Sequence, residues 1–244
     1  MSIQILSPDY QNSPLIVYSL DGVELVLRLP QHDGDYTPRL AASDLDILDH
    51  KLYEQGRQVS YHYLMLIENS WTYRFANSPI DAGHILLSMA VTHCEGELNK
   101  TYNFLNKASF SEWILDRLQQ HYGELIEEEI LELKLNELPI IEEEMWQYPK
   151  TPVELTFFEK DGAHWCCGWT GHPSIGQLDP FIRFPINKSH LVEIGIRFGG
   201  FNPEHFDSKE TVDGIKEALL HEFLSHIHVT YPSNVRDEMK RQPV

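Results

Sequence analysis

Two Asp-Gly dipeptides, each placed between short apolar segments, constrain the fold of this chain more than any other feature. The first separates Leu15–Leu20 from Val23–Leu29, and the second separates Val153–Phe158 from Ala163–Trp169. Asp-Gly readily adopts the positive φ angles of the two-residue turns that join antiparallel strands. The sequence therefore predicts a β-hairpin in each half of the chain.

Other segments complete an outline that is rich in strands. Apolar or alternating residues predict strands at Val59–Ile67, Trp71–Phe75, His84–His93, Phe181–Phe184 and Leu191–Phe198. Polar residues at Glu68-Asn69-Ser70 predict a break between the first two of these strands. Leucines at helical spacing favour a short helix over Ala41–Tyr53.

Two segments predict amphipathic helices, within residues 109–125 and 208–228. In the first, an apolar stripe follows a capping box at Ser109-x-x-Glu112, and in the second a box-like cap begins at Asp207. After residue 125 the period changes, because Leu131, Leu133 and Leu135 alternate with polar residues. This alternation predicts a strand whose solvated face carries the carboxylates.

The predicted class is therefore α+β, with mainly antiparallel sheet and two packed amphipathic helices. We expect an α+β unit at residues 1–126 and a second at 127–244, or one continuous domain. A shared order of elements suggests that 14–125 and 150–229 are pseudo-repeats, with Arg74 equivalent to Arg183. The alternative is that hairpins and capped helices simply recur, as they do in any α+β protein.

Charge is the feature that most limits function. The chain has 244 residues, with 37 acidic and 19 basic residues and a formal net charge of −18. Between Glu124 and Trp146, nine carboxylates face a single lysine, Lys134, which gives a local net charge of −8. A field of one sign repels nucleic acid and anionic lipid and attracts basic partners. We expect a basic protein partner, no nucleic acid and no membrane.

Location is predicted from weaker signals. The first residues lack the basic and apolar regions of a secretory signal, and no apolar run approaches the roughly 20 residues of a membrane span. Three cysteines, two of them adjacent, do not form a disulfide framework. These features favour the cytoplasm.

Motifs for metals and catalysis fail on spacing. His221 and His226 are five residues apart, where a zinc-protease helix requires four, and His228 follows near the helix end. Cys166 and Cys167, beside His164, form no C-x-x-C pair, so a buried core position is favoured over a metal site. The turn at residues 171–176 lacks the glycine spacing of a nucleophile elbow and the lysine of a P-loop. We expect no metal, no cofactor and no catalytic residue.

The predicted function is that of a non-enzymatic acidic binding protein, of the kind that acts as an immunity protein or inhibitor of a basic toxin. An enzyme with an unrecognised Glu/His acid–base site and a structural or adaptor subunit of an assembly remain as alternatives. The sequence leaves the oligomeric state open, and the glutamates could equally be only a solvated face. The expected contact residues are Glu127, Glu128, Glu129, Glu142, Glu143, Glu144, Trp146 and Tyr148.

Overall fold

The computed structural model describes residues 5–53, 63–76, 78–94, 101–173, 177–206 and 209–241. Three sequence predictions fall partly outside these residues. They are the start of the predicted strand Val59–Ile67, the cap at Asp207, and residues 174–176 of the turn after Gly171.

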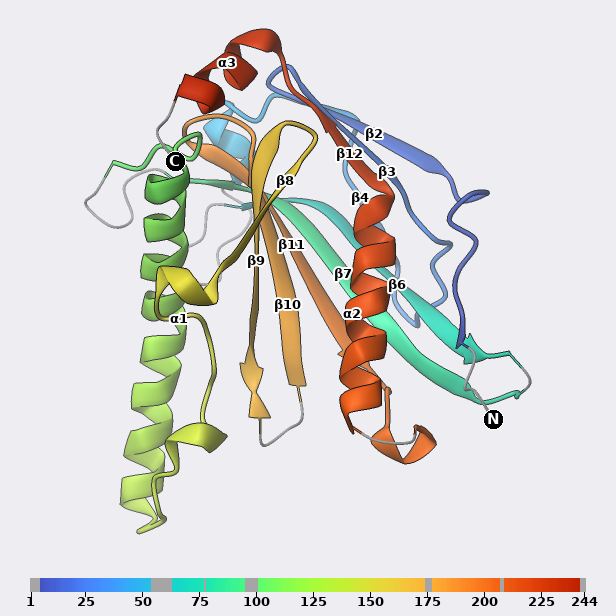
Figure 1. Cartoon of the computed structure of the whole chain (residues 1–244), viewed down its shortest axis with the longest axis vertical. Coiled ribbons are helices and arrows are strands. Elements are labelled where there is room, and N and C mark those ends of the chain that lie inside the picture. Colours follow the sequence, from blue (N-terminus) through green and yellow to red (C-terminus); the bar gives the residue numbers. More distant parts are fainter. Residues whose placement is uncertain are drawn as a thin grey trace. The chain divides into compact units, whose positions relative to one another are not determined.

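The larger of two sheets is antiparallel and contains eight strands in the order β1-β6-β7-β11-β10-β9-β8, with β4 paired to β6 beside this path. Strands β8 to β11 follow one another both along the chain and across the sheet (Figure 1). The eight strands are β1 Ile5–Leu6, β4 Arg39–Leu40, β6 Tyr63–Phe75, β7 Asp81–His93, β8 Thr156–Lys160, β9 Ala163–His172, β10 Gln177–Pro185 and β11 His190–Gly199.

The smaller sheet has four strands in the order β12-β3-β2-β5. Only the β2–β5 pair is parallel. Its strands are β2 Leu15–Leu20, β3 Val23–Arg28, β5 Asp44–Leu45 and β12 Ile227–Thr230. Together with the helices, the two sheets confirm the predicted α+β class with predominantly antiparallel sheet.

Both predicted hairpins are present. Asp21 and Gly22 have φ angles of 51° and 79° between β2 and β3, and Asp161 and Gly162 have 55° and 80° between β8 and β9. Positive φ at both central residues is what the tight turn between twisted strands requires. The dipeptides therefore fix the register of each hairpin locally.

Three α-helices accompany the sheets among the described residues. They are α1 Lys107–Leu135, α2 Lys209–Ser225 and α3 Ser233–Arg241. The short 3-10 helices are η1 His50–Tyr53, η2 Glu142–Glu144, η3 Pro152–Glu154 and η5 Pro203–His205. No helix in the described part of the chain is long and apolar enough to cross a membrane.

The first helix corrects two predictions. It continues through Leu131, Leu133 and Leu135, so the predicted strand is wrong. Leucine, glutamate and lysine are all strong helix formers, and extending an existing helix is easier than starting a strand. The N-cap is Asn106, whose Oδ1 accepts from the Ser109 N–H at 2.9 Å, so Ser109 lies inside the helix instead of capping it.

Other boundaries also differ from the predictions. Residues 41–53 contain β5 and η1 instead of a helix. Strand β6 continues through Asn69, where a break was predicted. The Asn69 Nδ2 donates to the Pro30 carbonyl at 3.0 Å, and this hydrogen bond allows the polar side chain to be buried within the strand. Helix α2 ends at Ser225, and residues 227–228 belong to β12.

The pseudo-repeat is only partly matched by the topology. Each half contains a long strand pair followed by a long helix, β6–β7–α1 and β10–β11–α2. However, the hairpin β2–β3 lies in the smaller sheet, whereas β8–β9 lies in the larger sheet beside β10. The strand order of the two halves therefore differs, and the similarity does not extend over 14–125 and 150–229 as a whole.

By packing, the chain divides into two compact units that are discontinuous in sequence. The first comprises Met1–Arg57, Tyr63–Val91 and Ile196–Pro232, and the second comprises Gln58–His62, Thr92–Gly195 and Ser233–Val244. Strands β7 and β11 each contribute residues to both units. The expected units at 1–126 and 127–244 stay a prediction.

Each unit has an aromatic core. In the first, the rings of Trp71 and Phe223 lie 5.8 Å apart, which places α2 against β6. In the second, α1 packs through Phe110 and Trp113 onto a cluster that includes Cys166 of β9 and Phe181 of β10. The second unit also contains the acidic stretch, so its packing decides which carboxylates are available.

Candidate protein-binding surface

Helix α1 is buried only over its first part. The helix has 29 residues, which corresponds to a length of about 43 Å. Its fully buried residues are Phe110, Ser111, Trp113, Ile114, Arg117 and Leu118. The remaining turns carry the acidic stretch beyond the core. We call residues 124–144, the end of α1 and the segment that follows it, the acidic arm.

Most of the predicted contact glutamates are exposed on this arm. Glu127 and Glu128 are exposed on α1, and η2 presents all three of its glutamates, Glu142, Glu143 and Glu144, to solvent. Figure 1 shows the chain leaving α1 and folding back along the helix, with η2 in the returning segment. The structure therefore places these carboxylates where a partner could reach them.

Exposed apolar side chains occur among these carboxylates. Leu131 and Leu135, four residues apart on α1, are 60% and 76% exposed. Side chains at this spacing are neighbours on one helix face. The exposed large apolar residues of the arm are Leu131, Leu135, Leu138, Ile140 and Ile141. The arm thus combines an apolar surface with strong negative charge.

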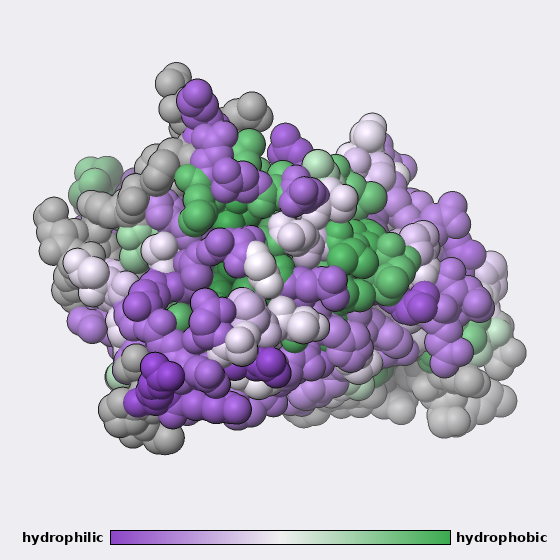
Figure 2. Space-filling model, turned by 90° about the horizontal axis from the view of Figure 1, so that it is seen from above, coloured by the Kyte–Doolittle hydropathy of each residue, from purple (hydrophilic) through white to green (hydrophobic). Residues whose placement is uncertain are grey.

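Exposed apolar residues are not confined to the arm. The face in Figure 2 is mainly hydrophilic but contains separate hydrophobic patches, and β2 also exposes Leu15 and Val17. Scattered exposure of this kind is ordinary on protein surfaces. What distinguishes the arm is that its apolar side chains alternate with carboxylates along one short stretch.

Three predicted contact residues, Glu129, Trp146 and Tyr148, lie in a seam at one side of the arm. We use the term seam for the contact region between α1 and the returning segment. It consists of Tyr122 and Glu129 of α1 together with Trp146, Tyr148 and His172. Tyr148 is buried, stacks on Tyr122 at 5.4 Å and donates its hydroxyl to Gln119 Oε1 at 2.8 Å. Burial raises the pKa of the Tyr148 phenol. Its ring therefore ties the returning segment to the helix.

Glu129 and Trp146 occupy the more open part of the seam. Glu129 Oε1 lies 3.0 Å from His172 Nε2, and the side chains are 26% and 14% exposed, respectively. The Trp146 ring is 5.3 Å from the His172 ring and perpendicular to it, and 5.5 Å from the Tyr122 ring. Glu129 Oε2 is buried and has no hydrogen-bond partner. Only one of the two carboxylate oxygens of Glu129 therefore has a hydrogen-bond partner.

A second charged pair lies under the first part of α1. Arg183 Nε donates to Glu193 Oε2 at 2.6 Å, and its guanidinium lies 4.7 Å from the Phe181 ring and 5.4 Å from the Trp113 ring. Arg183 is buried, so this pair fixes how α1 sits on β10 and β11. A buried, paired guanidinium of this kind orders a core and is closed to a partner.

The cysteine and histidine cluster on β9 is also a core feature. His164 Nε2 bonds the Phe104 carbonyl at 3.0 Å, and burial lowers the pKa of this imidazole. Burial raises the pKa of the Cys166 thiol to about 12, so it stays protonated and unreactive. His164 and Cys166 face α1 together, as the strand alternation predicts.

The histidines near residue 226 are separated by the fold. His221 is on α2, His228 is on β12, and His226 stacks on Tyr10 at 4.4 Å. Within the described residues, no group of three or more histidine, cysteine or acidic side chains could hold a metal ion. The expected absence of a metal stays a prediction.

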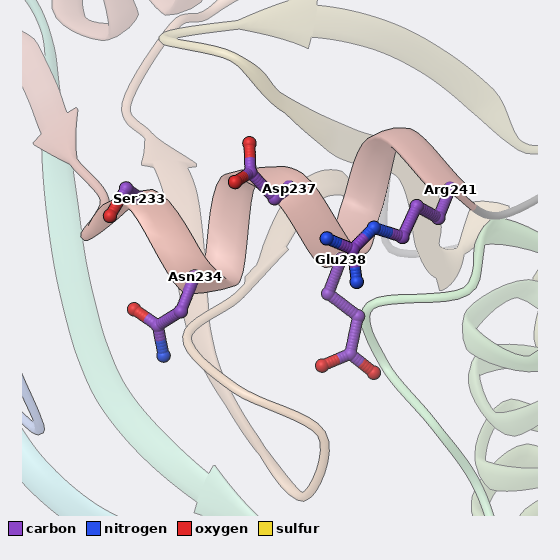
Figure 3. Close-up of a pocket in the computed structure, with 5 residues that line it drawn as sticks. All are labelled: Ser233, Asn234, Asp237, Glu238 and Arg241. Atoms are coloured by element: carbon purple, nitrogen blue, oxygen red, sulfur yellow. The ribbon is translucent and has the colours of Figure 1, made fainter.

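A hollow beside α3 offers no convergent chemistry. Its volume is about 680 Å³, and Figure 3 shows that all five labelled side chains come from one short helix, with Asn234 and Glu238 on one side and Asp237 on the other. Glu238 is already paired with Lys188 at 2.9 Å. We therefore place the candidate site on the acidic arm and the seam.

Comparisons with models of protein families, with curated proteins and with solved structures found no match. The function must therefore be argued from the residues of this chain.

Sequence reasoning missed two residues of the seam, Tyr122 and His172. The signal for Tyr122 was present, because Tyr122, Ile126 and Glu129 have the i, i+4, i+7 spacing of one helix face. It was hidden by the mistaken change from helix to strand. His172 gives no local signal, since it lies on β9, 43 residues further along the chain than Glu129, and only the tertiary fold brings the two side chains together.

Proposed function

We propose that this protein binds a basic protein partner through the acidic arm and acts by binding instead of turnover, in the manner of an immunity protein or inhibitor. The observation that carries this proposal is the exposure of Leu131 and Leu135 among the carboxylates of the arm. Apolar side chains supply affinity at the centre of an interface, while surrounding charge selects and steers the partner.

The sign of the charge indicates which class of partner fits. An enzyme or toxin that acts on nucleic acid has a basic surface, because it must neutralise phosphates. Rows of carboxylates such as Glu127, Glu128 and Glu142–Glu144 are suited to occupy that surface in place of the phosphates. The arm is also free of compensating lysines apart from Lys134. These features support capture of a basic protein.

The proposed location is the cytoplasm. The chain has three cysteines, two of them adjacent, and therefore lacks the disulfide framework that is typical of small secreted domains.

The test begins with affinity capture from the native host, repeated at high salt, and identification of the bound protein. Association rates are then measured against ionic strength for the wild type and for the triple variant Glu142→Gln, Glu143→Gln, Glu144→Gln. We expect slower association and a shallower salt dependence, because steering depends on exposed charge that salt screens. Folding should be almost unchanged, since η2 is exposed.

A charge-matched control removes three exposed carboxylates elsewhere, Glu24, Glu204 and Glu217, each replaced by glutamine. This control has the same net charge as the triple variant. If both variants slow association equally, overall charge and not the arm is responsible. If neither changes the rate, the arm is only a solvated face and the proposal fails.

A further inference from the structure

We infer that the seam holds one basic side chain of the partner, a lysine or arginine, with its cation between the Glu129 carboxylate and the Trp146 ring. This inference rests on the proposed function, because it identifies which group of a basic partner would enter the seam. It is carried by the geometry of the seam itself and not by the charge of the arm.

The first argument is the unsatisfied carboxylate. Glu129 uses Oε1 for His172 at 3.0 Å, while Oε2 is buried without a hydrogen-bond partner. Buried acceptors are nearly always bonded, so an unbonded one calls for an explanation. The side chain as a whole remains 26% exposed, and the last torsion of a glutamate is broad, so that a partial rotation can turn Oε2 toward an incoming donor. An N–H donor from the partner would supply the missing hydrogen bond to Oε2.

The second argument is the aromatic wall. The Trp146 ring stands perpendicular to His172 and lies 5.5 Å from Tyr122. Among the aromatic side chains, the face of a tryptophan ring attracts cations most strongly. Glu129 and Trp146 both contact His172, so a carboxylate and an aromatic ring adjoin the same imidazole. Together these two groups are complementary to a positively charged side chain with an apolar stem.

The chain itself already holds a cation against this group of rings. The Lys150 ammonium lies 5.6 Å from the centre of the Tyr148 ring, and Tyr148 stacks in turn on Tyr122. One ammonium of this protein thus uses an outer ring of the seam. This contact is an example, within the same group of rings, of the cation–aromatic interaction that we infer for Trp146.

The chemistry also excludes other ligands. An anion would be repelled by Glu129 and the neighbouring glutamates. A metal ion needs several ligands, and within the described residues no group of three or more suitable side chains is present. A single carboxylate next to an indole fits one organic cation, so the expected ligand is one side chain and not a cluster.

The test is a titration of the full chain followed by NMR, using two short blocked peptides as probes. They are acetyl-Gly-Lys-Gly-amide and a neutral peptide with norleucine in place of lysine. We expect the lysine peptide to shift the Trp146 indole N–H signal in a saturable way, and the norleucine peptide to have no such effect. An arginine peptide should behave like the lysine peptide.

The decisive variant is Glu129→Gln, which keeps an acceptor for His172 but removes the negative charge. We expect the affinity for the lysine peptide to fall about tenfold, as for the loss of a charge-assisted hydrogen bond. The control is Glu217→Gln, the same substitution on an exposed position of α2, which should leave the affinity unchanged. Trp146→Leu removes the aromatic ring and should weaken binding even if Glu129→Gln alters the local structure. Because the indole signal is absent from this variant, its binding is followed by the backbone amide signals of residues around Glu129, which are also recorded for the wild type.

The inference is overturned if the lysine peptide gives no saturable shift, if norleucine binds equally well, or if both Glu129→Gln and Trp146→Leu bind like the wild type. These outcomes are separate from a failure of the proposed function. That failure would appear as partner association that is insensitive to Glu142, Glu143 and Glu144, whatever the peptide does at the seam.

Discussion

The two ends of α1 are held by different forces. Around Phe110 and Trp113 the helix is buried against β9 and β10, and its position is set by packing. Around Leu131 and Leu135 the same helix lies in solvent. The exposed end depends on helix-forming residues and on the nucleus that the packed end supplies. Stability and binding can therefore be changed separately within one helix.

The largest effect is expected at the packed end. Phe110 is fully buried and contacts the rings of Phe104 and His164. Phe110→Ala leaves a cavity, and such substitutions cost about 3–5 kcal/mol in the free energy of unfolding. Chemical denaturation monitored by circular dichroism measures this loss.

The matched change at the exposed end is Leu135→Ala. Because Leu135 is 76% exposed, its truncation should change the free energy of unfolding by less than about 0.5 kcal/mol. A similar loss in both variants would show that the arm is packed, and the contrast between the two ends would be wrong.

An effect of intermediate size on the free energy of unfolding is expected when the pH is lowered, because His164 at the packed end is buried. Burial lowers the pKa of His164 in the folded state below the ordinary value of a histidine, about 6.5. The unfolded state then binds more protons, so the stabilising contribution is complete above about pH 6.5 and is lost as the pH falls toward the folded pKa. His164→Gln should therefore flatten the fall in stability below about pH 6.5.

The free energies of unfolding of the wild type and His164→Gln, measured between about pH 5 and 8, provide the comparison. His121, whose pKa is also lowered by burial and by Arg117, remains in both proteins. The difference between the two curves therefore isolates His164. Parallel curves would mean that its protonation does not oppose folding.

Sequence reasoning identified the hairpins and the packed end of α1 because these depend on local signals. The Asp-Gly turns require positive φ at adjacent residues, and the stripe through Phe110, Ile114 and Leu118 has one period throughout. The prediction of a strand at Leu131–Leu135 is wrong, because it rests on alternation over only five residues. A short alternating run cannot outweigh continuation of a helix that is already formed.

The candidate site could likewise be predicted only in part from the sequence. The charge of the arm is visible in the sequence, and so are Glu129, Trp146 and Tyr148 as individual residues. Their different environments are not visible, because the returning segment is held to β9 by the paired bridge between Gln147 and Gly171. That long-range pairing brings His172 to Glu129 and leaves Glu127 and Glu128 in solvent.

A small stabilising effect is expected where α1 ends, at Glu137. This residue has a φ of 54°, and Leu138 N–H donates to the Leu133 carbonyl at 2.9 Å, as in helix ends that favour glycine. Relief of the left-handed strain is worth about 1 kcal/mol, and the greater freedom of glycine in the unfolded chain offsets about half of it. Glu137→Gly should therefore raise the free energy of unfolding by about 0.5 kcal/mol. Glu137→Ala is the control, because it removes the same carboxylate but retains the strained Cβ. Denaturation curves in which alanine is as stabilising as glycine would show that the charge and not the backbone limits this end of the helix.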